Sequence, residues 1–508
     1  MLRNLPFSRT SVFAFTLCCL FLPGSILVIQ AAPADERPNI VFLFADDQAT
    51  YSMGCYGTPG AKTPNLDQLA REGMVFDRHY DTTAICMASR VNVMTGLYEY
   101  KAGCNFDSGN LLDSHWQNSY PIQLRKAGYQ TAFAGKFGFT VCEEPNGKGK
   151  LPESDFDRWG GGPGQTSYQT AKNASMREYA NDYPHSTLSY GAFGRDFIND
   201  AAKKDAPFCL SISFKAPHHP VQPDPKFDDV YKGAKFVKPA NYGREHGEHF
   251  SKQSRQGRQY ERFHSWNYAD KYDETMALYY QQIYAIDVAT GMIRKAIEEA
   301  GVSKNTVVIY SSDNGFLNGS HGYGSKVLPY EESSRVPLIV FDPRHSSSGK
   351  QLRCDALTGN VDIGATFFDL AGIEPPESMD GRSLMRLLDD PQNEIHDYLP
   401  LVNVWGPNEV HSFAVVTKRG KYVYWPYAGE GFEATQEAYD MRNDGLELHN
   451  MMGKPEYQAQ VDALKKTYSK ALKHWMKEGA TYHGYDRFVT IFDPDKPWSE
   501  KSRLYRKK

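Results

Sequence analysis

Two pairs of oxygen-bearing side chains each follow an apolar run in this chain of 508 residues. Asp46 and Asp47 follow the run that begins at Asn39, and Asp313 and Asn314 follow a second run with the letters TVVIY. Adjacent carboxylates repel each other unless a cation neutralises them, and all-oxygen ligation suits Ca²⁺ or Mg²⁺ rather than zinc. A solvated acidic loop would explain one such pair alone. Because the arrangement occurs twice, the sequence favours a cation site built from both pairs.

A cysteine and an arginine one helical turn apart, Cys86 and Arg90, lie between these pairs in the sequence. A buried structural thiol is the commoner fate of a single cysteine. Polar neighbours and a predicted helix that runs to Gly96 favour a reactive site instead, because a helix N-terminus stabilises an anion placed beside it. Cys86 is therefore the candidate nucleophile.

Basic residues occur at three further points along the chain, each after a strand-like run or after the second ligand pair. They are Lys136, His218, His219, His321 and Lys326. Ligands of open α/β sheets bind beyond the carboxyl ends of the strands. The nucleophile, the oxygen ligands and these cationic groups are therefore expected at one edge of one sheet.

The elements that must position these residues alternate between strand-like and helix-like segments up to about residue 372. Helices are predicted at Thr63–Gly73 and Asp273–Ala300. The predicted strands are Asn39–Phe44, Tyr129–Ala134, Pro207–Phe214, Thr306–Tyr310 and Val336–Phe341. Alternation of this kind predicts an α/β sandwich with a large, mostly parallel central sheet flanked by helices.

The alternation of strand-like and helix-like segments gives way to a different pattern after Pro375 and Pro376. The segments Phe413–Thr417 and Lys421–Trp425 read as an antiparallel hairpin, and a helix is predicted at Gln458–Glu478. We therefore expect a catalytic α/β domain over residues 37–384 and a smaller C-terminal α+β subdomain with an antiparallel sheet over residues 385–508.

The N-terminal residues 1–32 read as a signal peptide. Arg3 and Arg9 precede an apolar run from Ser11 to Ile29, and an A-x-A-like cleavage site begins at Ala32. An uncleaved membrane anchor is the alternative. Cleavage is favoured, which predicts a secreted or periplasmic protein without stable membrane insertion. The formal net charge of −4 gives no reason to expect a nucleic-acid partner.

The order of these motifs resembles the type I sulfatases of the alkaline-phosphatase superfamily. The family's Cys-x-Pro-x-Arg motif corresponds to the segment Cys86–Arg90, and its Gly-Lys-Trp-His and Pro-His-x-Pro segments correspond to residues 135–138 and 217–220. The stretch Tyr439–Asp444 is similar to the family's Tyr-Asp-Leu-x-x-Asp-Pro ending. The resemblance covers about residues 38–444 and implies an alkaline-phosphatase-like fold.

The resemblance also implies the chemistry of the site. Cys86 would be oxidised to formylglycine, whose hydrated aldehyde attacks sulfur through one hydroxyl and expels the alcohol. Loss of the proton of the second hydroxyl then ejects sulfate and restores the aldehyde. Arg90 would hold the hydrate. The metal ligands would be Asp46, Asp47, Asp313 and Asn314, with Ca²⁺ favoured and Mg²⁺ the alternative; sulfate would be contacted by Lys136, His218 and Lys326.

Two positions depart from the family pattern. Ala88 stands where proline is usual, which matches a minority Cys-x-Ala-x-Arg variant, and Gly138 stands where a histidine assists the nucleophile. The base of the second step is therefore open. His321 is a candidate substrate-binding replacement for the absent histidine.

A basic and aromatic segment between residues 235 and 271 is a further candidate binding surface. Guanidinium groups on sulfate and aromatic rings on sugar faces could clamp a sulfated sugar chain, whereas a solvated insertion is the alternative. The residues concerned are Arg244, His246, His249, Lys252, Arg255, Arg258, Arg262 and His264, interleaved with Tyr242, Phe250, Tyr260, Phe263 and Trp266.

The sequence thus predicts a sulfuric ester hydrolase that acts on a sulfated carbohydrate and requires a sulfatase-maturing enzyme as a partner. A phosphonate monoester or phosphodiester hydrolase on the same scaffold is one alternative. A catalytically silent protein that binds sulfated glycans is the other, favoured by the departures at Ala88 and Gly138.

Overall fold

A central strand of seven residues, β1 (Asn39–Ala45), organises the main sheet, and every one of its residues is buried. It pairs in parallel with β8 (Phe208–Ser213) on one side and with β9 (Thr306–Ser312) on the other. The computed structural model describes residues 37–505, so the predicted signal peptide lies outside the described residues. Continuous apolar runs form these strands because both faces of the sheet are covered.

The main sheet has eight strands in the order β11-β2-β10-β9-β1-β8-β5-β7. Of its pairings, only those of β10 with β2 and with β9 are antiparallel, so the prediction of a mostly parallel sheet is confirmed. The strands not yet named are β2 (Met74–Phe76), β5 (Gln130–Lys136), β7 (Arg158–Gly162), β10 (Leu338–Phe341) and β11 (Leu352–Cys354).

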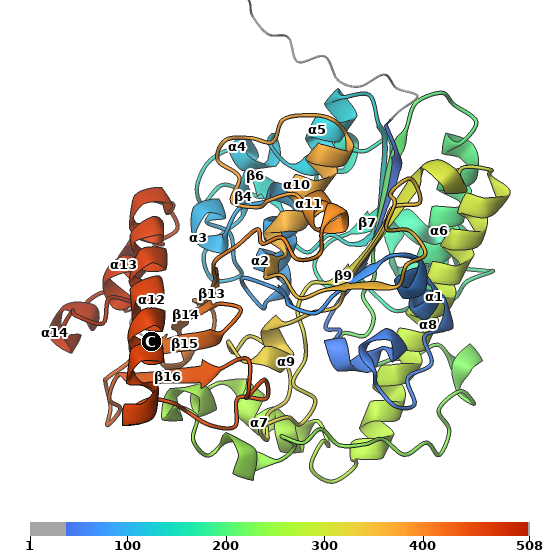
Figure 1. Ribbon diagram of the computed structural model, residues 1–508. Helices are drawn as coiled ribbons and strands as arrows, with labels where there is room; N and C mark the ends of the chain where they lie inside the picture. Colours follow the sequence, from blue (N-terminus) through green and yellow to red (C-terminus); the bar gives the residue numbers. More distant parts are fainter. Residues whose placement is uncertain (1–36, 506–508) are drawn as a thin grey trace, which may run out of the picture. The chain divides into compact units, whose positions relative to one another are not determined.

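Alternate side chains of β1 enter two different hydrophobic cores. Ile40, Phe42 and Phe44 pack with α2 (Cys86–Thr95), α5 (Tyr120–Lys126), α10 (Val361–Leu370) and α11 (Met385–Asp389). Val41, Leu43 and Ala45 pack with α1 (Pro64–Glu72), α6 (Ser186–Ala201) and α8 (Tyr272–Glu299). The two groups of helices flank the sheet in Figure 1. The strand period of two therefore produces the sandwich.

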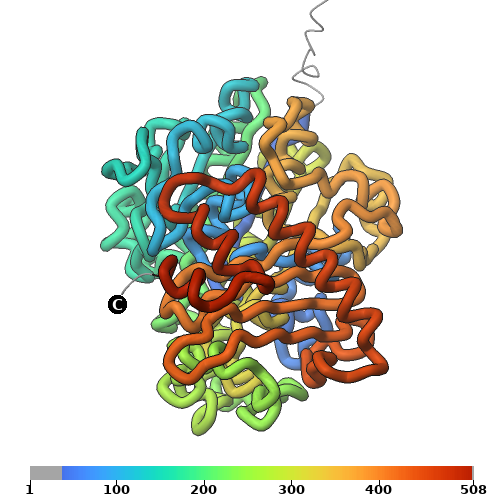
Figure 2. The backbone as a smooth tube through the Cα atoms, turned by 90° about the vertical axis from the view of Figure 1, so that its left-hand side faces the viewer, coloured from blue at the N-terminus to red at the C-terminus, as the bar shows by residue number. Residues whose placement is uncertain are grey.

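A second, antiparallel sheet of four strands follows in the C-terminal part, in the order β13-β14-β15-β16. Its members are β13 (Leu399–Asn403), β14 (Ser412–Val416), β15 (Gly420–Trp425) and β16 (Thr435–Asp440). The helix α12 (Gln458–Glu478) covers it, with Trp475 and Tyr468 against Phe413. Figure 2 shows this helix, in red, crossing in front of the strands. The predicted hairpin is therefore confirmed as β14 and β15.

Short elements complete the part of the chain that the structure describes. The short helices are α3 (Glu99–Ala102), α4 (Asp113–Trp116), α7 (Arg258–Ser265), α9 (Glu331–Ser334), α13 (Asp486–Ile491) and α14 (Trp498–Lys501). Two short strand pairs also form: β3 (His79–Tyr80) pairs with β12 (Thr358–Gly359), and β4 (Leu111–Leu112) pairs with β6 (Val141–Cys142). Within residues 37–505 no helix is long and apolar enough to cross a membrane. The described cysteines are all unpaired.

The four-stranded sheet shares a hydrophobic core with segments of the N-terminal part. Tyr80 and Tyr330 from the N-terminal part lie in the same buried cluster as Phe413 and Trp425. The described residues accordingly form one compact unit. The domain boundary between residues 384 and 385 stays a prediction.

Candidate active site

The carboxyl ends of β1 and β9 bring the two predicted ligand pairs together. Ala45 lies beside Ser312 in the parallel register, so the residues that follow the two strands emerge at one edge. The amide N–H of Asp47 donates to Oδ1 of Asp313 over 3.1 Å, and Nδ2 of Asn314 donates to Oδ1 of Asp47 over 2.7 Å. Asp46 is buried beside them. The side chains expected to share a cation are therefore neighbours.

The donor set of these four residues fits a divalent cation. Asp46, Asp313 and Asn314 are fully buried and Asp47 is 2% exposed, so bulk water does not solvate the carboxylates. Oδ1 of Asn314 has no hydrogen-bond partner within residues 37–505, although a buried polar atom normally has one. Buried carboxylate oxygens together with a free amide oxygen are hard ligands of the kind that Ca²⁺ and Mg²⁺ take.

Cys86 is the first residue of α2 and is 2% exposed. Its Sγ lies 3.4 Å from Oδ1 of Asp46 and accepts a hydrogen bond from Nζ of Lys326 over 2.7 Å. Burial raises the pKa of the Cys86 thiol to about 12, with Asp46 adding to the rise and Lys136 opposing it. Burial therefore disfavours the thiolate, which is the reactive form of cysteine.

Arg90 ties the first turn of α2 to the ligand edge. Nε of Arg90 lies 2.9 Å from Oδ2 of Asp313 and Nη2 lies 2.8 Å from the same oxygen. Nη1 donates to the carbonyl oxygen of Lys136 over 2.7 Å and to Oγ of Ser213. This network fixes the helix that carries Cys86 against the ends of three strands.

Lys136 ends β5 and reaches Oδ2 of Asp46 over 2.5 Å. Burial by itself would raise the pKa of Asp46, but Lys136, His218 and Lys326 outweigh it and hold the pKa well below its ordinary value. Burial, with Asp46 as a like-charged neighbour, raises the pKa of Asp313 to about 6. Both carboxylates are therefore ionised near neutral pH.

Lys326 sits in a segment of unusual backbone conformation. Its neighbours Ser325 and Val327 have φ values of 69° and 92°, and a positive φ is rare for a β-branched residue such as valine. The Lys326 ammonium bonds Oδ1 of Asp47 as well as Cys86. We name the eight residues Asp46, Asp47, Cys86, Arg90, Lys136, Asp313, Asn314 and Lys326 the strand-end cluster.

His218 lies where the strand-end cluster opens outward. Its Nε2 is 3.9 Å from Oδ2 of Asp47, its side chain is 18% exposed, and Nδ1 has no partner among the described residues. Burial lowers the pKa of His218 to about 3, although Asp46 and Asp47 act in the opposite direction. His219 instead stacks on Trp266, with ring centroids 3.7 Å apart. His218, rather than His219, therefore faces the cluster.

His321, like His219, is a predicted candidate that the structure does not bring to the strand-end cluster. Its ring nitrogens lie 2.9 Å from Nδ2 of Asn241 and 3.0 Å from the carbonyl oxygen of His246. It belongs to a separate buried group, which we name the junction cluster and which contains His321, Glu331, Glu332, Lys421 and Glu447. Its fully buried ring cannot replace the histidine absent at position 138 without rearrangement.

The surroundings of Gly138 leave no room for a side chain in the present arrangement. The residue has a φ of 91°, and a Cβ at this position would lie 2.4 Å from Cδ of Arg90. Arg90 thus fills the space that a side chain would need. Ala88, the other departure, is fully buried and packs with Ile85, Val327 and Trp405.

Two residues near the site were not predicted from the sequence. Lys215 immediately precedes the Ala216–Pro220 segment; it is 7% exposed, and burial lowers its pKa although Asp46 acts in the opposite direction. The sequence could have indicated Lys215, because this residue adjoins the Ala216–Pro220 segment that resembles a sulfatase motif. Trp405 follows β13 and packs beside Ala88. Nothing in the local sequence links Trp405 to Cys86.

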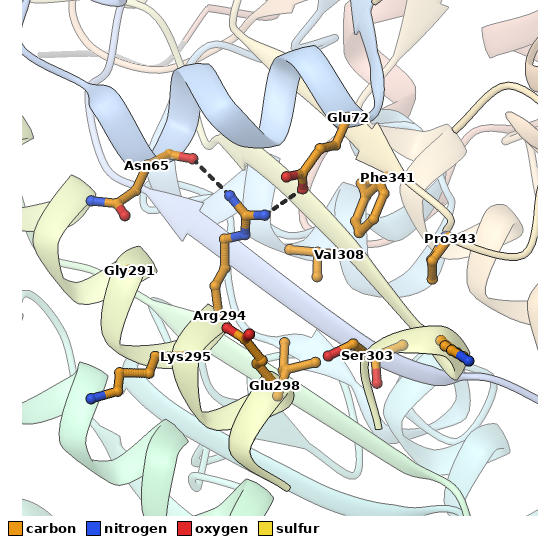
Figure 3. Close-up of a pocket in the computed structure, with 13 residues that line it drawn as sticks. Asn65, Glu72, Gly291, Arg294, Lys295, Glu298, Ser303, Val308, Phe341 and Pro343 are labelled. Atoms are coloured by element: carbon orange, nitrogen blue, oxygen red, sulfur yellow. Dashed lines mark hydrogen bonds and ion pairs between the residues drawn. The ribbon is translucent and has the colours of Figure 1, made fainter. Parts of the chain in front are cut away.

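The pocket drawn in Figure 3 lies at the wrong end of the sheet for this chemistry. It has a volume of about 850 Å³ and is lined by Thr306, the first residue of β9, whereas Asp313 follows the last. The guanidinium of Arg294 in this pocket already bonds the carbonyl oxygen of Asn65 and the carboxylate of Glu72. The strand-end cluster is therefore the candidate active site.

Comparison with known proteins agrees with this geometry. The profile of the sulfatase family matches residues 38–373, and a profile described as N-sulphoglucosamine sulphohydrolase, C-terminal, matches residues 319–474. An N-acetylglucosamine-6-O-sulfatase of Bacteroides thetaiotaomicron is 29% identical, with 86% of this chain and 88% of the relative covered. An arylsulfatase of Clostridium perfringens is 27% identical, with 86% and 95% covered.

Solved structures share the fold. One, in complex with its substrate D-glucosamine-2-N,6-O-disulfate, has a TM-score of 0.70 at 25% identity and covers 87% of this chain and 98% of its own. A phosphonate monoester hydrolase of Agrobacterium radiobacter has a TM-score of 0.68 at 20% identity and covers 86% and 96%. At that identity the second likeness concerns the fold alone.

Proposed function

The chain belongs to the sulfatase family, and on that premise we propose that it removes sulfate from a sulfated carbohydrate with a formylglycine formed from Cys86 and one divalent cation. The observation that carries the proposal is the setting of Cys86. The Cys86 thiol is buried and lies against Asp46 and Lys326 inside the strand-end cluster. Such a thiol fits a precursor that is oxidised before use. The hydrated aldehyde would supply an oxygen nucleophile for attack on sulfur.

The cation would be held by Asp46, Asp47, Asp313 and Asn314, and it would neutralise the carboxylates and polarise the sulfate oxygens. The three carboxylates of the strand-end cluster face three cationic side chains, those of Arg90, Lys136 and Lys326. A divalent cation therefore leaves the site with a net positive formal charge. Such a site favours the binding of an anionic sulfate ester.

The protein side chains have separable roles in this proposal. Arg90 fixes the first turn of α2 through Asp313 and so orients residue 86. Lys136 and Lys326 supply donors for the sulfate oxygens as negative charge develops on them. His218 has the most exposed of these side chains, and its Nε2 faces Asp47, so it is placed to contact the incoming substrate.

The named relatives indicate which substrates to test first. One relative is named as an N-acetylglucosamine-6-O-sulfatase, one solved structure holds D-glucosamine-2-N,6-O-disulfate as its substrate, and another relative is named as an arylsulfatase. We propose a sulfated amino sugar as the natural substrate class and an aryl sulfate as a convenient reporter. A matched phosphodiester and a phosphonate monoester serve as competing substrates, because phosphonate monoester hydrolases share the fold.

Export is also proposed, on the basis of the charged and apolar N-terminal sequence. Maturation would then require a formylglycine-generating or other sulfatase-maturing enzyme that accepts Ala88 in its recognition motif. Neither the export nor the maturing enzyme is inferred from the geometry of the strand-end cluster.

The decisive experiment combines peptide mass spectrometry across Cys86 with an assay of sulfate release from protein made in a host that matures sulfatases. Formylglycine makes the peptide about 18 Da lighter than unmodified cysteine. Cys86→Ala should lower kcat for aryl sulfate by about 10,000-fold, because the nucleophile is removed. Cys55→Ala, at a half-buried cysteine elsewhere, is the control. Turnover that survives in Cys86→Ala would overturn the proposal.

A further inference from the structure

Two arginines of α7 lie at the rim of the strand-end cluster. Arg258 and Arg262 are four residues apart on one helix and so share a face. Nη1 of Arg262 donates to Oγ of Ser325 over 2.8 Å, and Ser325 precedes Lys326, which contacts Cys86. The helix therefore packs directly against the segment that carries a catalytic lysine.

Each guanidinium lies over the face of a tryptophan. The Arg258 guanidinium carbon is 4.4 Å from the ring centroid of Trp405, and that of Arg262 is 4.0 Å from the ring centroid of Trp266. Trp405 packs against the small cluster of Ile85, Ala88 and Val327, whose first member is the neighbour of Cys86. The first pair is thereby located beside the nucleophile position.

The second pair lies on the histidine side of the site. Trp266 stacks on His219, the neighbour of His218, with ring planes inclined by 7°. It also stacks on Phe316, which follows Asn314 by two residues. The two Arg–Trp pairs therefore contact different segments that lead into the strand-end cluster.

Neither arginine has an acidic partner within the described chain, where no Asp or Glu oxygen lies within 4.0 Å of its guanidinium nitrogens. Arg90 and Arg335, in contrast, each form ion pairs. Burial, with Arg258 as a like-charged neighbour, lowers the pKa of Arg262 to about 10. Two neighbouring guanidinium groups without a counter-ion provide a site for an external anion.

Two other arginines of the basic and aromatic segment donate hydrogen bonds to backbone carbonyl oxygens. Arg244 lies 3.9 Å from the ring centroid of Tyr260 and donates to its carbonyl oxygen over 3.1 Å. Arg255 donates to the carbonyl oxygen of Glu248 over 2.7 Å. Of the segment predicted to clamp a sulfated sugar, Arg258 and Arg262 are therefore the two residues for which we infer anion binding.

We propose that Arg258 and Arg262 bind a second anionic group, a sulfate or a carboxylate, of the same saccharide that presents its sulfate ester to residue 86. The proposal rests on the proposed function and adds a basis for substrate selection. The planar guanidinium fork matches both sulfate and carboxylate oxygens, and stacking on indole fixes the fork before the ligand arrives. A saccharide with one sulfate would leave this subsite empty.

The test compares kcat/KM for three saccharides on the same preparation: glucosamine 6-sulfate, glucosamine 2-N,6-O-disulfate, and a 6-sulfated glucosamine linked to a uronate. Ratios between substrates cancel the fraction of enzyme that has been matured. The wild type should prefer at least one doubly anionic saccharide by about tenfold, as a charge-assisted bidentate contact implies. Preference for the second sulfate or for the uronate identifies the source of the anion.

Arg258→Gln should reduce that preference about tenfold, and Arg262→Lys, which keeps the charge but loses the planar fork, should reduce it less. Lys252→Gln removes an exposed charge from the same segment and should leave the preference unchanged. A wild-type ratio near one for both doubly anionic saccharides, or a ratio unchanged in both arginine variants, would overturn the subsite.

Failure of the proposed function would look different, because no saccharide would then release sulfate. The subsite would still be tested by titration calorimetry of the disulfate against the wild type and Arg258→Gln. About tenfold weaker binding in the variant would support it, and equal affinity would reject it.

Discussion

The molecule contains two buried ionic clusters that look alike in composition and differ in setting. In the strand-end cluster, Lys326 bonds Asp47 and Cys86 while 4% exposed. In the junction cluster, Lys421 is fully buried between Glu331 at 2.8 Å and Glu447 at 2.7 Å. Each lysine thus links acidic or reactive groups from distant parts of the chain.

The difference lies in access and in the elements that are joined. The strand-end cluster lies at the carboxyl ends of parallel strands and opens at His218, which is 18% exposed. The junction cluster connects α9 to β15 and to Glu447 beyond β16, and its members are at most 6% exposed. Burial and charge alone therefore do not identify an active site; the opening to solvent and the position in the sheet do.

The largest effects should come from removing the two lysines separately. Lys421→Met should lower the free energy of unfolding by about 3–5 kcal/mol, because it leaves buried carboxylates without their cation. Lys326→Met should lower kcat by about 100- to 1,000-fold, because a donor to developing negative charge is lost. Chemical denaturation and sulfate release, measured on both variants in the presence of Ca²⁺, separate the two roles.

Lys470→Met, at an exposed lysine of α12, is the control and should change neither quantity. If Lys421→Met impaired turnover of the folded enzyme as strongly as Lys326→Met, the distinction between the two clusters would be wrong.

Removal of the divalent cation with a chelator is the second test that should distinguish the two clusters. A ligand that binds only the folded state stabilises it by about 2.7 kcal/mol when its free concentration is 100 times Kd. Removing Ca²⁺ should therefore lower Tm and abolish sulfate release, and returning Ca²⁺ should restore both. Asn314→Ala should raise the ion concentration needed for half-maximal recovery.

The matched variant is Glu332→Gln, which changes a possible ligand of the junction cluster. It should recover at the same ion concentration as the wild type. A shift in Glu332→Gln but not in Asn314→Ala would move the cation to the junction cluster.

Local patterns in the sequence predicted much of the fold. The apolar run at Asn39–Ala45 forms a central strand because it can be buried on both faces, and the periodic segment at Gln458–Glu478 forms α12 with the predicted bounds. The residues that follow parallel strands converge because the topology requires it, which is why Asp46 and Asp313 could be paired in advance.

Long-range packing determined what could not be predicted. His321 is close in sequence to Lys326, but its ring is held by Asn241 and by the backbone of His246. Trp405 lies far along the chain yet packs beside Ala88. A motif gives the order of residues along a segment and does not specify which neighbour from another segment occupies the adjacent space.

The last prediction concerns pH and the surroundings of the junction cluster. Glu437 is 1% exposed and accepts hydrogen bonds from the amide of Ser251 over 2.6 Å and from the hydroxyl of Tyr439 over 2.9 Å. Burial nevertheless raises the pKa of Glu437 from 4.5 to about 7. Between these values the folded state binds more protons than the unfolded state, so this group's contribution to stability falls as pH rises, by at most about 1.4 kcal/mol per pH unit. The contribution is fully present below pH 4.5 and is lost above pH 7.

Glu437→Gln should remove this dependence, so the difference in unfolding free energy between wild type and variant should fall from pH 5 to pH 7 and then level off. Glu433→Gln, at an exposed position nearby, should show no such difference. The ratio of the turnover rates of Glu437→Gln and wild type should stay constant over the same range, because Glu437 lies outside the strand-end cluster. A stability difference that is flat or rises with pH would show that Glu437 is ionised in the folded state, and a pH-dependent turnover ratio would show that the junction region is coupled to catalysis.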